Sequence, residues 1–432
     1  MQIALISEHA SPLAALGGVD AGGQNVYVDK VARMLARRGH RVDVATRRDD
    51  PALPSVVALA PGVRVLHVDG GPARFIAKEA MLEHMPEFSA ALMRMVAGSK
   101  RYDLVHANFF MSGLVALALK ARFGMPMVMT FHALGRVRRQ HQGAADGFPP
   151  ERIEIEHRIV AHADRVIAEC PQDASDLQRL YDAAPERIAT VPCGVDLAEF
   201  APGDRLAARR ALGFGEHEFV VLQLGRMVPR KGVDNVIRAV TMLADSSCTR
   251  LVVVGGDAAP AGAAPCHEVQ RLVQLAGSCG IAERVTFAGH HGRDELARYY
   301  TACDVFVTTP WYEPFGITPL EAMASARPVI GSAVGGIQHS VVDGVTGFLV
   351  PPHEPRALAA RLDQLRSDPA LARAMGRAGA RRVREHFTWE RVAEDLEAVY
   401  ATVLAETAPR ATLGPAYASY GTRDRRETRR AA

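Results

Sequence analysis

Cysteine is scarce in this chain, and the few cysteines present are scattered. The 432 residues include only Cys170, Cys193, Cys248, Cys266, Cys279 and Cys303. They form neither a Cys-x-x-Cys pair nor a Cys/His spacing typical of a zinc site, so a disulfide scaffold and a zinc module are both excluded. We interpret them as free thiols of a protein that works in a reducing cytoplasm.

Long apolar runs and a strong net charge are also missing. The most apolar stretch, 113–131, is interrupted by Lys120, Arg122 and Pro126, and residues 1–7 lack the basic start and apolar centre of a signal peptide. The formal charge of +3 is too small to indicate a polyanion binder, so we expect no nucleic-acid partner. We therefore expect a cytoplasmic protein and leave open a peripheral contact with the inner face of a membrane.

What the chain does contain is a repeated alternation of short apolar runs with helical periodicity. The runs are rich in β-branched residues and lie at 2–7, 41–46, 63–68, 104–107 and 127–131, and again at 219–225, 250–255, 284–289, 305–309 and 328–332. Continuous apolar strands separated by helices indicate parallel sheets covered on both faces. A chain of this length with 48% hydrophobic residues can form two such doubly wound α/β domains.

The boundary between the two domains is expected near 200–216, where an Ala-Pro-Gly-Asp turn follows a strand-like segment. We expect a first Rossmann-like domain at 1–203, a second at 204–388, a C-terminal helix at 389–405 that packs back on the first domain, and a disordered basic tail at 406–432. The tail is rich in arginine and has almost no apolar periodicity, which favours a solvated segment over a membrane contact. Ligands of open parallel sheets lie outside the carboxyl ends of the strands, so functional motifs should follow strands.

The strongest motif follows the expected strand at 305–309 and reads E-P-F-G-I-T-P-L-E from Glu313 to Glu321. It predicts a helix with Thr318 at the N-cap, Pro319 at N1 and Glu321 at N3. The backbone N–H groups of 316–318 would then point out of the positive helix end, which suits a diphosphate. A plain capping box between Thr318 and Glu321 explains the second glutamate about as well.

A second motif, at 225–232, follows the expected strand at 219–224 and carries Arg226 and Lys231. Two cations five residues apart on a strand-to-helix loop can hold one pyrophosphate, because arginine offers forked donors and lysine a mobile point charge. For the bare spacing, a solvated basic turn is the favoured alternative.

Two further segments lie in the first half of the chain. The glycine-rich loop at 17–28 includes Gly23 and Asn25 and allows the backbone to approach a ligand closely, although it is not a G-x-G-x-x-G fingerprint. His132 follows the expected strand at 127–131. A lone histidine is more often a satisfied core or capping residue, but its place at the carboxyl end of a strand favours a role in the cleft.

Together these segments resemble family 4 of the retaining glycosyltransferases, over about residues 3–400. The resemblance implies the GT-B fold, with two facing Rossmann-like domains and an active-site cleft between them. It implies transfer of a hexosyl group, of glucose or N-acetylglucosamine type, from a UDP-linked donor. The catalytic residues it implies are His132, Arg226, Lys231 and Glu313. The donor-binding residues it implies are Gly23, Arg226, Lys231, Glu313, Phe315, Gly316, Ile317, Thr318 and Glu321, with Glu313 at the sugar hydroxyls and Glu321 at the ribose.

Within that family, the segments at 11–28 and 130–136 are similar to inositol-phosphate N-acetylglucosaminyltransferases of mycothiol synthesis and to sucrose-phosphate synthases. This similarity implies that His132 touches the transferred sugar. It also implies that Asn25, Lys78 and Arg152 contact the acceptor. A solvated basic surface explains each of the two cations equally well when it is considered alone.

The chain also departs from these enzymes. Phe109 and Ala133 stand where they have a tyrosine and a threonine, and each missing hydroxyl removes a contact worth about 1–3 kcal/mol. Gln338-His339 replaces a Pro-Glu pair common in the family, with unknown effect. We therefore expect a sugar, sugar-phosphate or polyol-phosphate acceptor without choosing among them.

No Asp-x-Asp pair, which many transferases use to hold a divalent metal, occurs in the chain. We therefore expect no cofactor and no metal, with Arg226, Lys231 and the helix end opposite the departing diphosphate. The alternatives are a phosphorylase or epimerase of the same architecture and a catalytically inactive sugar-nucleotide-binding subunit. The complete set of motif residues argues against lost activity, and the oligomeric state stays open.

Overall fold

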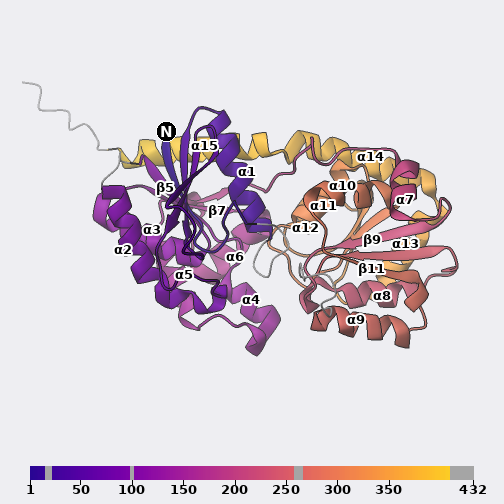
Figure 1. The fold of residues 1–432 in the computed structure, drawn as a ribbon. Helices are drawn as coiled ribbons and strands as arrows, with labels where there is room; N and C mark the ends of the chain where they lie inside the picture. The colour runs from indigo at the N-terminus through magenta and orange to yellow at the C-terminus, as the bar shows by residue number, and fades with distance from the viewer. Residues whose placement is uncertain (15–21, 98–101, 257–265, 409–432) are drawn as a thin grey trace, which may run out of the picture.

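The computed structural model describes residues 1–14, 22–97, 102–256 and 266–408. Two α/β units lie side by side, each built on a sheet that helices cover (Figure 1). The first sheet has eight strands in the order β3-β4-β2-β1-β5-β6-β7-β8, and the second has six in the order β11-β10-β9-β12-β13-β14. In both sheets the chain runs outward from the first strand and then returns to its other side, which is the doubly wound Rossmann topology. The predicted α/β architecture is confirmed.

The elements have the following bounds. The first sheet contains β1 (Gln2–Ile6), β2 (Arg41–Arg47), β3 (Val56–Ala60), β4 (Val63–Val68), β5 (Leu104–Asn108), β6 (Met127–Thr130), β7 (Arg165–Ala168) and β8 (Ile188–Thr190). The second contains β9 (Phe219–Leu224), β10 (Thr249–Val254), β11 (Val285–Gly289), β12 (Val305–Thr308), β13 (Val329–Ser332) and β14 (Gly347–Val350). The helices are α1 (Gly23–Arg37), α2 (Met85–Ala97), α3 (Phe110–Phe123), α4 (Gly135–Gln142), α5 (Glu151–His162), α6 (Pro171–Tyr181), α7 (Arg205–Leu212), α8 (Val233–Thr241), α9 (His267–Ser278), α10 (Arg293–Ala302), α11 (Ile317–Ala324), α12 (Ile337–Ser340), α13 (Pro355–Ser367), α14 (Pro369–His386) and α15 (Trp389–Thr407).

Most strands are largely apolar because helices cover both faces of each sheet, whereas the edge strands β3, β8 and β11 are less buried. One hydrophobic core lies under α2, α3 and α5 on the first sheet, and another lies under α8, α9 and α13 on the second. A third core is continuous from the first sheet through α1 and α15 into the second. Parallel strands with two buried faces read as unbroken apolar runs, which is the pattern found in the sequence.

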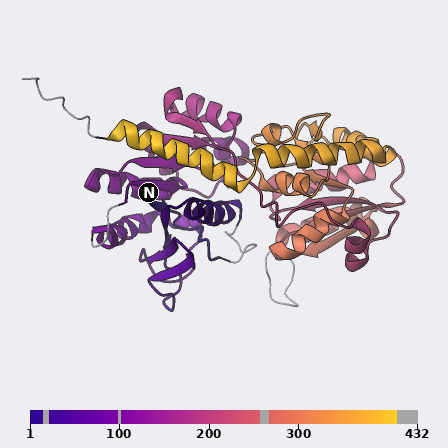
Figure 2. The same cartoon turned by 90° about the horizontal axis from the view of Figure 1, so that it is seen from above.

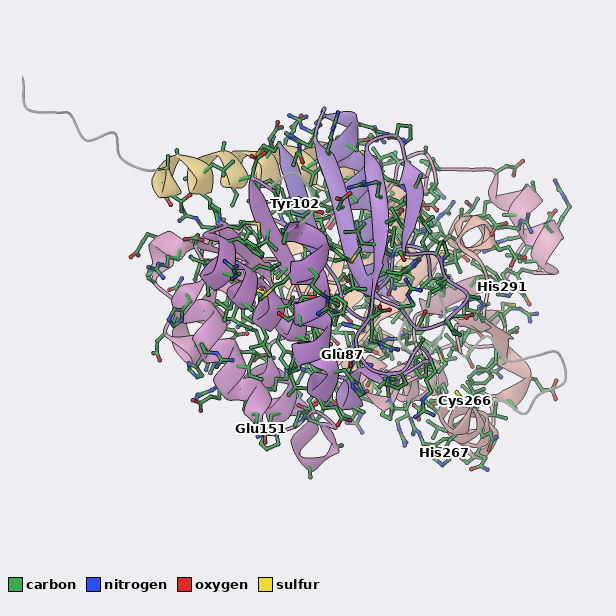
Figure 3. The ribbon with its side chains drawn as sticks, turned by 60° about the vertical axis from the view of Figure 1, so that its left-hand side comes forward. Glu87, Tyr102, Glu151, Cys266, His267 and His291 are labelled. Carbon is green, nitrogen blue, oxygen red and sulfur yellow. The ribbon has the colours of Figure 1, made fainter. Side chains whose placement is uncertain are left out.

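Polar contacts close the amino ends of the first sheet. Tyr102, labelled in Figure 3, lies just before β5, and its hydroxyl donates to Asp43 Oδ2 at 2.6 Å. Arg64 Nε also donates to Asp43, at 2.8 Å to Oδ1. The carboxyl ends of the strands face the second unit, where Cys170, just after β7, donates from Sγ to the Pro314 carbonyl oxygen at 3.4 Å.

Two chain segments connect the units, and they lie next to each other. Val195, on the first connection, pairs with Thr388 on the second in an isolated parallel bridge, and Val195 N–H donates to Phe387 O at 2.9 Å. A Cβ at Gly194 would lie 2.7 Å from the backbone nitrogen of Trp389, so the two connections approach each other closely. We propose that the chain divides there into domains at 1–203 and 204–388.

Helix α15 returns along the first unit and packs against α1, as Figure 2 shows from above. The Tyr400 hydroxyl lies 2.7 Å from His106 Nδ1 in the buried interior. The helix continues to Thr407, so the expected tail starting at 406 is wrong at its first two residues. Glu406 forms an ion pair with Arg165 at 2.7 Å that holds this last turn, and 409–432 lie outside the described residues. No helix in the described ranges is long and apolar enough to cross a membrane.

Arg209 on α7 is a fully buried cation with an unusually complete set of partners. Its Nη1 donates to the carbonyl oxygens of Gly215, Glu216 and Glu218 at 2.8–2.9 Å, and its Nη2 donates to Asp304 Oδ2 at 2.6 Å. The side chain therefore ties the approach to β9 to the start of β12.

We predict that Arg209→Ala lowers the free energy of unfolding by about 3 kcal/mol or more, because it strands several buried acceptors without a donor. Arg210→Ala, which removes the neighbouring side chain with 65% exposure, should cost at most about 0.5 kcal/mol. Urea unfolding followed by tryptophan fluorescence measures both. Equal midpoints for the two variants would contradict this account of Arg209.

Candidate active site

The loop after β9 brings basic residues to the edge of the second sheet. β9 ends at Leu224, a single 3-10 turn spans Pro229–Lys231, and α8 starts directly afterwards. Gly232 has a φ of +66°, and a Cβ there would lie 2.0 Å from the carbonyl oxygen of Thr309. Only glycine allows this approach to the end of β12, and it holds Lys231 against the neighbouring loop.

Lys231 forms an ion pair with Glu313, the first glutamate of the strongest motif. Its Nζ lies 2.5 Å from Glu313 Oε2, and the two side chains are 15% and 13% exposed. Arg230, for which the motif suggested no role, lies with Nη1 3.7 Å from the same oxygen. The exposed Arg226 adds its positive charge to the same group. One carboxylate therefore faces three cations.

Burial and charge act in opposite directions on this pair. Burial alone would raise the pKa of Glu313, but the charges of Lys231 and Arg230 hold that pKa below its usual range. Burial lowers the pKa of Lys231, and Arg230 adds to the shift although Glu313 opposes it. Glu313 is therefore an anion at neutral pH.

The helix after Glu313 begins earlier than predicted. α11 has Gly316 as its N-cap, so the prediction of Thr318 at the N-cap and Pro319 at N1 is wrong. Gly316 has a φ of +89°, which lets the chain enter the helix two residues sooner. Within the described residues, the backbone N–H groups of 316–318 donate to no backbone carbonyl, and they lie at the positive end of α11.

Glu321 is buried inside the second domain and takes no part in a capping box. The Tyr300 hydroxyl donates to its Oε2 at 2.8 Å, and Arg293 Nη1 donates to its Oε1 at 3.2 Å. Burial raises the pKa of Glu321 although Arg293 opposes the shift. Of the two interpretations of this glutamate, the structure excludes the cap.

The start of α1 lies across the cleft from α11. A Cβ at Gly23 would lie 3.7 Å from Ile317 Cδ1, so the two predicted donor residues face each other between the domains. Asn25 is 3% exposed, and its Oδ1 accepts the Gly22 N–H at 2.9 Å while its Nδ2 donates to Ser11 O at 3.0 Å. Asn25 therefore caps α1. The preceding glycines, at 17 and 18, lie outside the described residues.

His132 is held by three neighbours, of which Glu169 and Asn108 lie outside the sequence motifs. Its Nδ1 lies 3.1 Å from Glu169 Oε1, its Nε2 lies 3.0 Å from Asn108 Oδ1, and the Tyr27 ring packs edge-on at 4.8 Å. The residue has a φ of +56°, a conformation that bulky residues rarely adopt and that occurs at functional sites. Asn108 ends β5 and Glu169 follows β7, so the strand-end rule could have found both.

The pKa of Glu169 shows which interaction prevails there. Burial would raise it, but the charge of His132 and hydrogen bonds from His132 and Cys193 lower it below its usual range. Both ring nitrogens of His132 thus face oxygen acceptors, one of them an ionised carboxylate.

The predicted acceptor residues are already engaged by partners within the first domain. Arg152 is 2% exposed, its Nε donates to Glu156 Oε1 at 2.7 Å, and its Nη2 donates to Ala133 O. The guanidinium also packs over the Phe109, Phe110 and Phe148 rings at 4.5–4.9 Å. Lys78 Nζ lies 3.3 Å from Glu79 Oε1. Both cations have carboxylate neighbours of their own.

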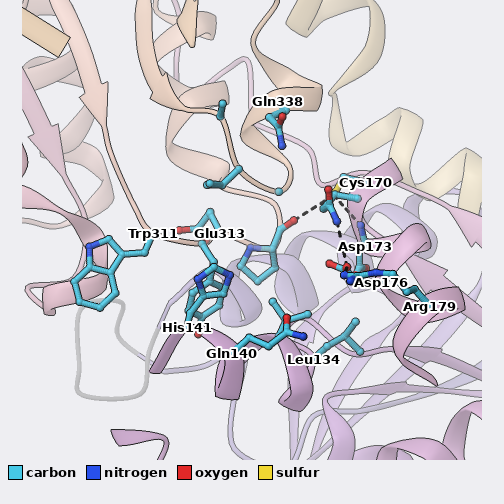
Figure 4. Close-up of a pocket in the computed structure, with 17 residues that line it drawn as sticks. Leu134, Gln140, His141, Cys170, Asp173, Asp176, Arg179, Trp311, Glu313 and Gln338 are labelled. Atoms are coloured by element: carbon cyan, nitrogen blue, oxygen red, sulfur yellow. Dashed lines mark hydrogen bonds and ion pairs between the residues drawn. The ribbon is translucent and has the colours of Figure 1, made fainter. Parts of the chain in front are cut away.

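A pocket of about 240 Å³ opens between the domains beside Glu313. Figure 4 shows it between α4 and α6 on one side and the loops after β12 and β13 on the other. Asp173 and Asp176 line one wall, and Cys170 Sγ donates across the cleft to Pro314 O at 3.4 Å. Burial and the charge of Glu169 raise the pKa of Asp173 to about 7.

Family models match the chain in two parts. One described as "Glycosyltransferase Family 4" matches residues 21–199, and one described as "Glycosyl transferases group 1" matches residues 204–382. The D-inositol 3-phosphate glycosyltransferase of Salinispora tropica is 39% identical over 419 residues, which cover 94% of this chain and 86% of that protein. D-inositol 3-phosphate glycosyltransferase 1 of Catenulispora acidiphila is 40% identical over 406 residues, 93% and 96% of the two chains. This chain is a family 4 glycosyltransferase.

Solved structures agree on the fold of the glycosyltransferase. Sucrose-phosphate synthase from Thermosynechococcus elongatus has a TM-score of 0.86 and 36% identity, with 94% of this chain and 99% of that one covered. HepE from Anabaena, solved with UDP and glucose, has a TM-score of 0.73 at 20% identity, with coverage of 93% and 100%, which supports the fold alone. The predicted family and the GT-B fold are confirmed. No group of three or more His, Cys, Asp or Glu that could hold a metal ion is found where the structure describes the chain.

We predict that the contribution of Asp173 to the stability of the glycosyltransferase falls as pH rises from about 4 through about 7, because folded Asp173 keeps its proton to a higher pH than the unfolded chain does. Asp173→Asn cannot ionise and should melt about 2–4 °C above wild type at pH 8, with a smaller gain at pH 5. Thermal melts across this range measure it. Asp395→Asn, which removes the partner of Arg391 at 3.1 Å on α15, is the control and should show no such gain. A constant difference at every pH would contradict the prediction.

Proposed function

We propose that this glycosyltransferase transfers a hexosyl group, of glucose or N-acetylglucosamine type, from a UDP-linked donor to an acceptor held in the interdomain cleft. Transfer retains the configuration at the anomeric carbon, as the family resemblance implies. The observation that carries the proposal is the group of Arg226, Arg230 and Lys231 around the single carboxylate Glu313. The three cations outnumber the one carboxylate, and the remaining positive charge can balance the negative charge of a bound diphosphate.

The same cations can stabilise the diphosphate as it leaves the sugar. The bond between the anomeric carbon and the diphosphate oxygen breaks, a bond to the acceptor oxygen forms, and the acceptor proton passes to the departing diphosphate. Negative charge develops on the diphosphate, and Lys231, Arg226 and the N–H groups of 316–318 would stabilise it from fixed positions. We propose that no metal is needed for this step.

Glu313 and His132 would bind the sugar from opposite domains. The ionised Glu313 accepts hydrogen bonds from sugar hydroxyls, and its neighbours Phe315 to Thr318 lie along the diphosphate. His132 would meet the sugar from the first domain, with Gly23 leaving space beside Ile317. Glu321, buried at 3% exposure, would hold the ribose.

The acceptor is a sugar, a sugar phosphate or a polyol phosphate. The names of the relatives favour D-inositol 3-phosphate. Against it, Arg152 is neutralised by Glu156, and Phe109 and Ala133 offer no hydroxyl. Asn25, Lys78 and Arg152 remain the acceptor contacts that the resemblance implies. We also propose a cytoplasmic location, which the six free thiols support.

We predict that a screen of UDP- and GDP-sugars against sugar phosphates, myo-inositol phosphate and lipid-linked sugars gives UDP release, and that EDTA leaves it intact. Lys231→Ala and Glu313→Gln should each lower kcat by about 100-fold or more, because each removes charge aimed at the reacting centre. Circular dichroism and melting temperature check that the fold persists.

Lys120→Ala is the matched control, since it breaks a lysine–carboxylate pair of 2.7 Å outside the cleft and should leave kcat unchanged. Complete loss of turnover in EDTA, restored by a divalent cation, would refute the metal-free step. Donor binding without any turnover or slow donor hydrolysis would instead identify a binding subunit.

A further inference from the structure

Tyr312, the residue before Glu313, reaches across the cleft into the first domain. The Gln142 Nε2 donates to its hydroxyl at 2.7 Å, and the His141 ring stacks on its ring at 5.0 Å with an interplanar angle of 19°. Arg138 Nη1 lies 3.5 Å from the same hydroxyl. All three partners belong to α4, so one side chain of the second domain contacts one helix of the first. We refer to this set of interactions as the α4 contact.

The Tyr312 side chain also contacts Arg230 of its own domain. Arg230 Cζ lies 5.1 Å from the ring centroid, and Arg230 Nη1 donates to the Tyr312 carbonyl oxygen at 3.4 Å. A guanidinium over a phenol ring is attractive, and its strength increases as water is excluded. The same guanidinium lies 3.7 Å from Glu313. Tyr312 therefore connects α4 with the cations around Glu313.

The burial of Tyr312 comes from the cleft and is not required by the core of its domain. The side chain is 5% exposed, yet among the described residues of the three hydrophobic cores Phe315 is a member and Tyr312 is not. If the domains moved apart, the phenol would lose most of its cover. Because Tyr312 is covered by both domains, it stabilises the arrangement in which the two domains are close together.

The chemistry of His141 suits this stacking. Burial lowers the pKa of His141, although the charge of Asp176 opposes the shift. A neutral imidazole stacks on the phenol without repelling Arg230, whose guanidinium also lies near the ring.

We propose that Tyr312 is a positioning residue, which fixes Glu313 relative to His132 by anchoring the β12–α11 loop to α4. α4 begins at Gly135, three residues after His132, so the helix that holds Tyr312 also continues from the histidine. The inference rests on the proposed function, in which Glu313 and His132 bind one sugar from two domains. Loss of the contact would let the two halves of the sugar site separate, and a displacement of about 1 Å can cost up to about 100-fold in rate.

The test compares three variants with a matched control. Tyr312→Ala removes the ring and the hydroxyl, Tyr312→Phe removes the hydroxyl alone, and Gln142→Ala removes its donor. Tyr299→Phe is the control, because Tyr299 is also buried and its hydroxyl lies 2.8 Å from His291 Nε2, but both residues belong to the second domain. Melting temperatures show that each variant is folded.

Two readouts are measured, UDP release from the donor that the wild type uses and small-angle X-ray scattering with saturating UDP. Tyr312→Ala should lower kcat by about 10- to 100-fold, change the donor KM less than about twofold, and increase the radius of gyration with UDP. Tyr312→Phe and Gln142→Ala should each lower kcat by about threefold, with no further loss in the double variant, because they remove one shared hydrogen bond. Tyr299→Phe should match wild type.

A Tyr312→Ala variant with the kcat and the radius of gyration of wild type would overturn the inference. So would additive losses in the double variant, since these would mean that Tyr312 and Gln142 act separately. If the wild type releases no UDP from any donor, the proposed function has failed, and the scattering comparison then decides alone whether Tyr312 holds the domains closed.

Discussion

In each domain, the residues of the site lie where the strand order of a parallel sheet reverses. β9 and β12 are neighbours in the second sheet, but the chain leaves them toward opposite sides, so their carboxyl-end loops open a crevice between them. Lys231 follows β9 and Glu313 follows β12, and the crevice is where their side chains meet. The first sheet repeats the arrangement between β1 and β5, where Asn108 ends β5 and supports His132.

Electrostatics then explains why this crevice holds charged groups that burial would otherwise disfavour. A carboxylate with little exposure is stable here because Lys231 and Arg230 lie beside it, and their charges outweigh the burial of Glu313. Burial lowers the pKa of Lys231, and repulsion by Arg230 and Arg226 adds to the shift. A ligand with two negative charges would relieve this repulsion, which supports the proposal that these cations bind a diphosphate.

The sequence was sufficient for the α/β fold and for the family. Apolar strands predicted both sheets, and the strand-end rule pointed to the loops that carry Arg226, Lys231 and Glu313, while the family resemblance supplied the roles proposed for these residues. The start of α11 was missed because a threonine followed by proline is a strong local cap, whereas the left-handed conformation of Gly316 depends on packing around it. Arg230 and Tyr312 were missed for another reason, since their partners lie on other loops or in the other domain, and no spacing along one segment encodes such a pairing. Glu169 could have been found because it follows β7, but its pairing with His132 could not.

The two halves of the site are held by different forces, and this bears on how they come together. In the first domain His132 has a rare backbone conformation that Glu169, Asn108 and Tyr27 hold from three directions, so its ring is fixed whether or not the cleft is closed. In the second domain Glu313 is oriented by ion pairs, and the residue before it, Tyr312, is covered in part by α4. Under the proposed function, a rigid half of the sugar site faces a half whose position depends on α4. The alignment of Glu313 with His132 therefore depends on contacts across the cleft, among them the hydrogen bond from Gln142 to Tyr312 and the stacking of His141 on the Tyr312 ring.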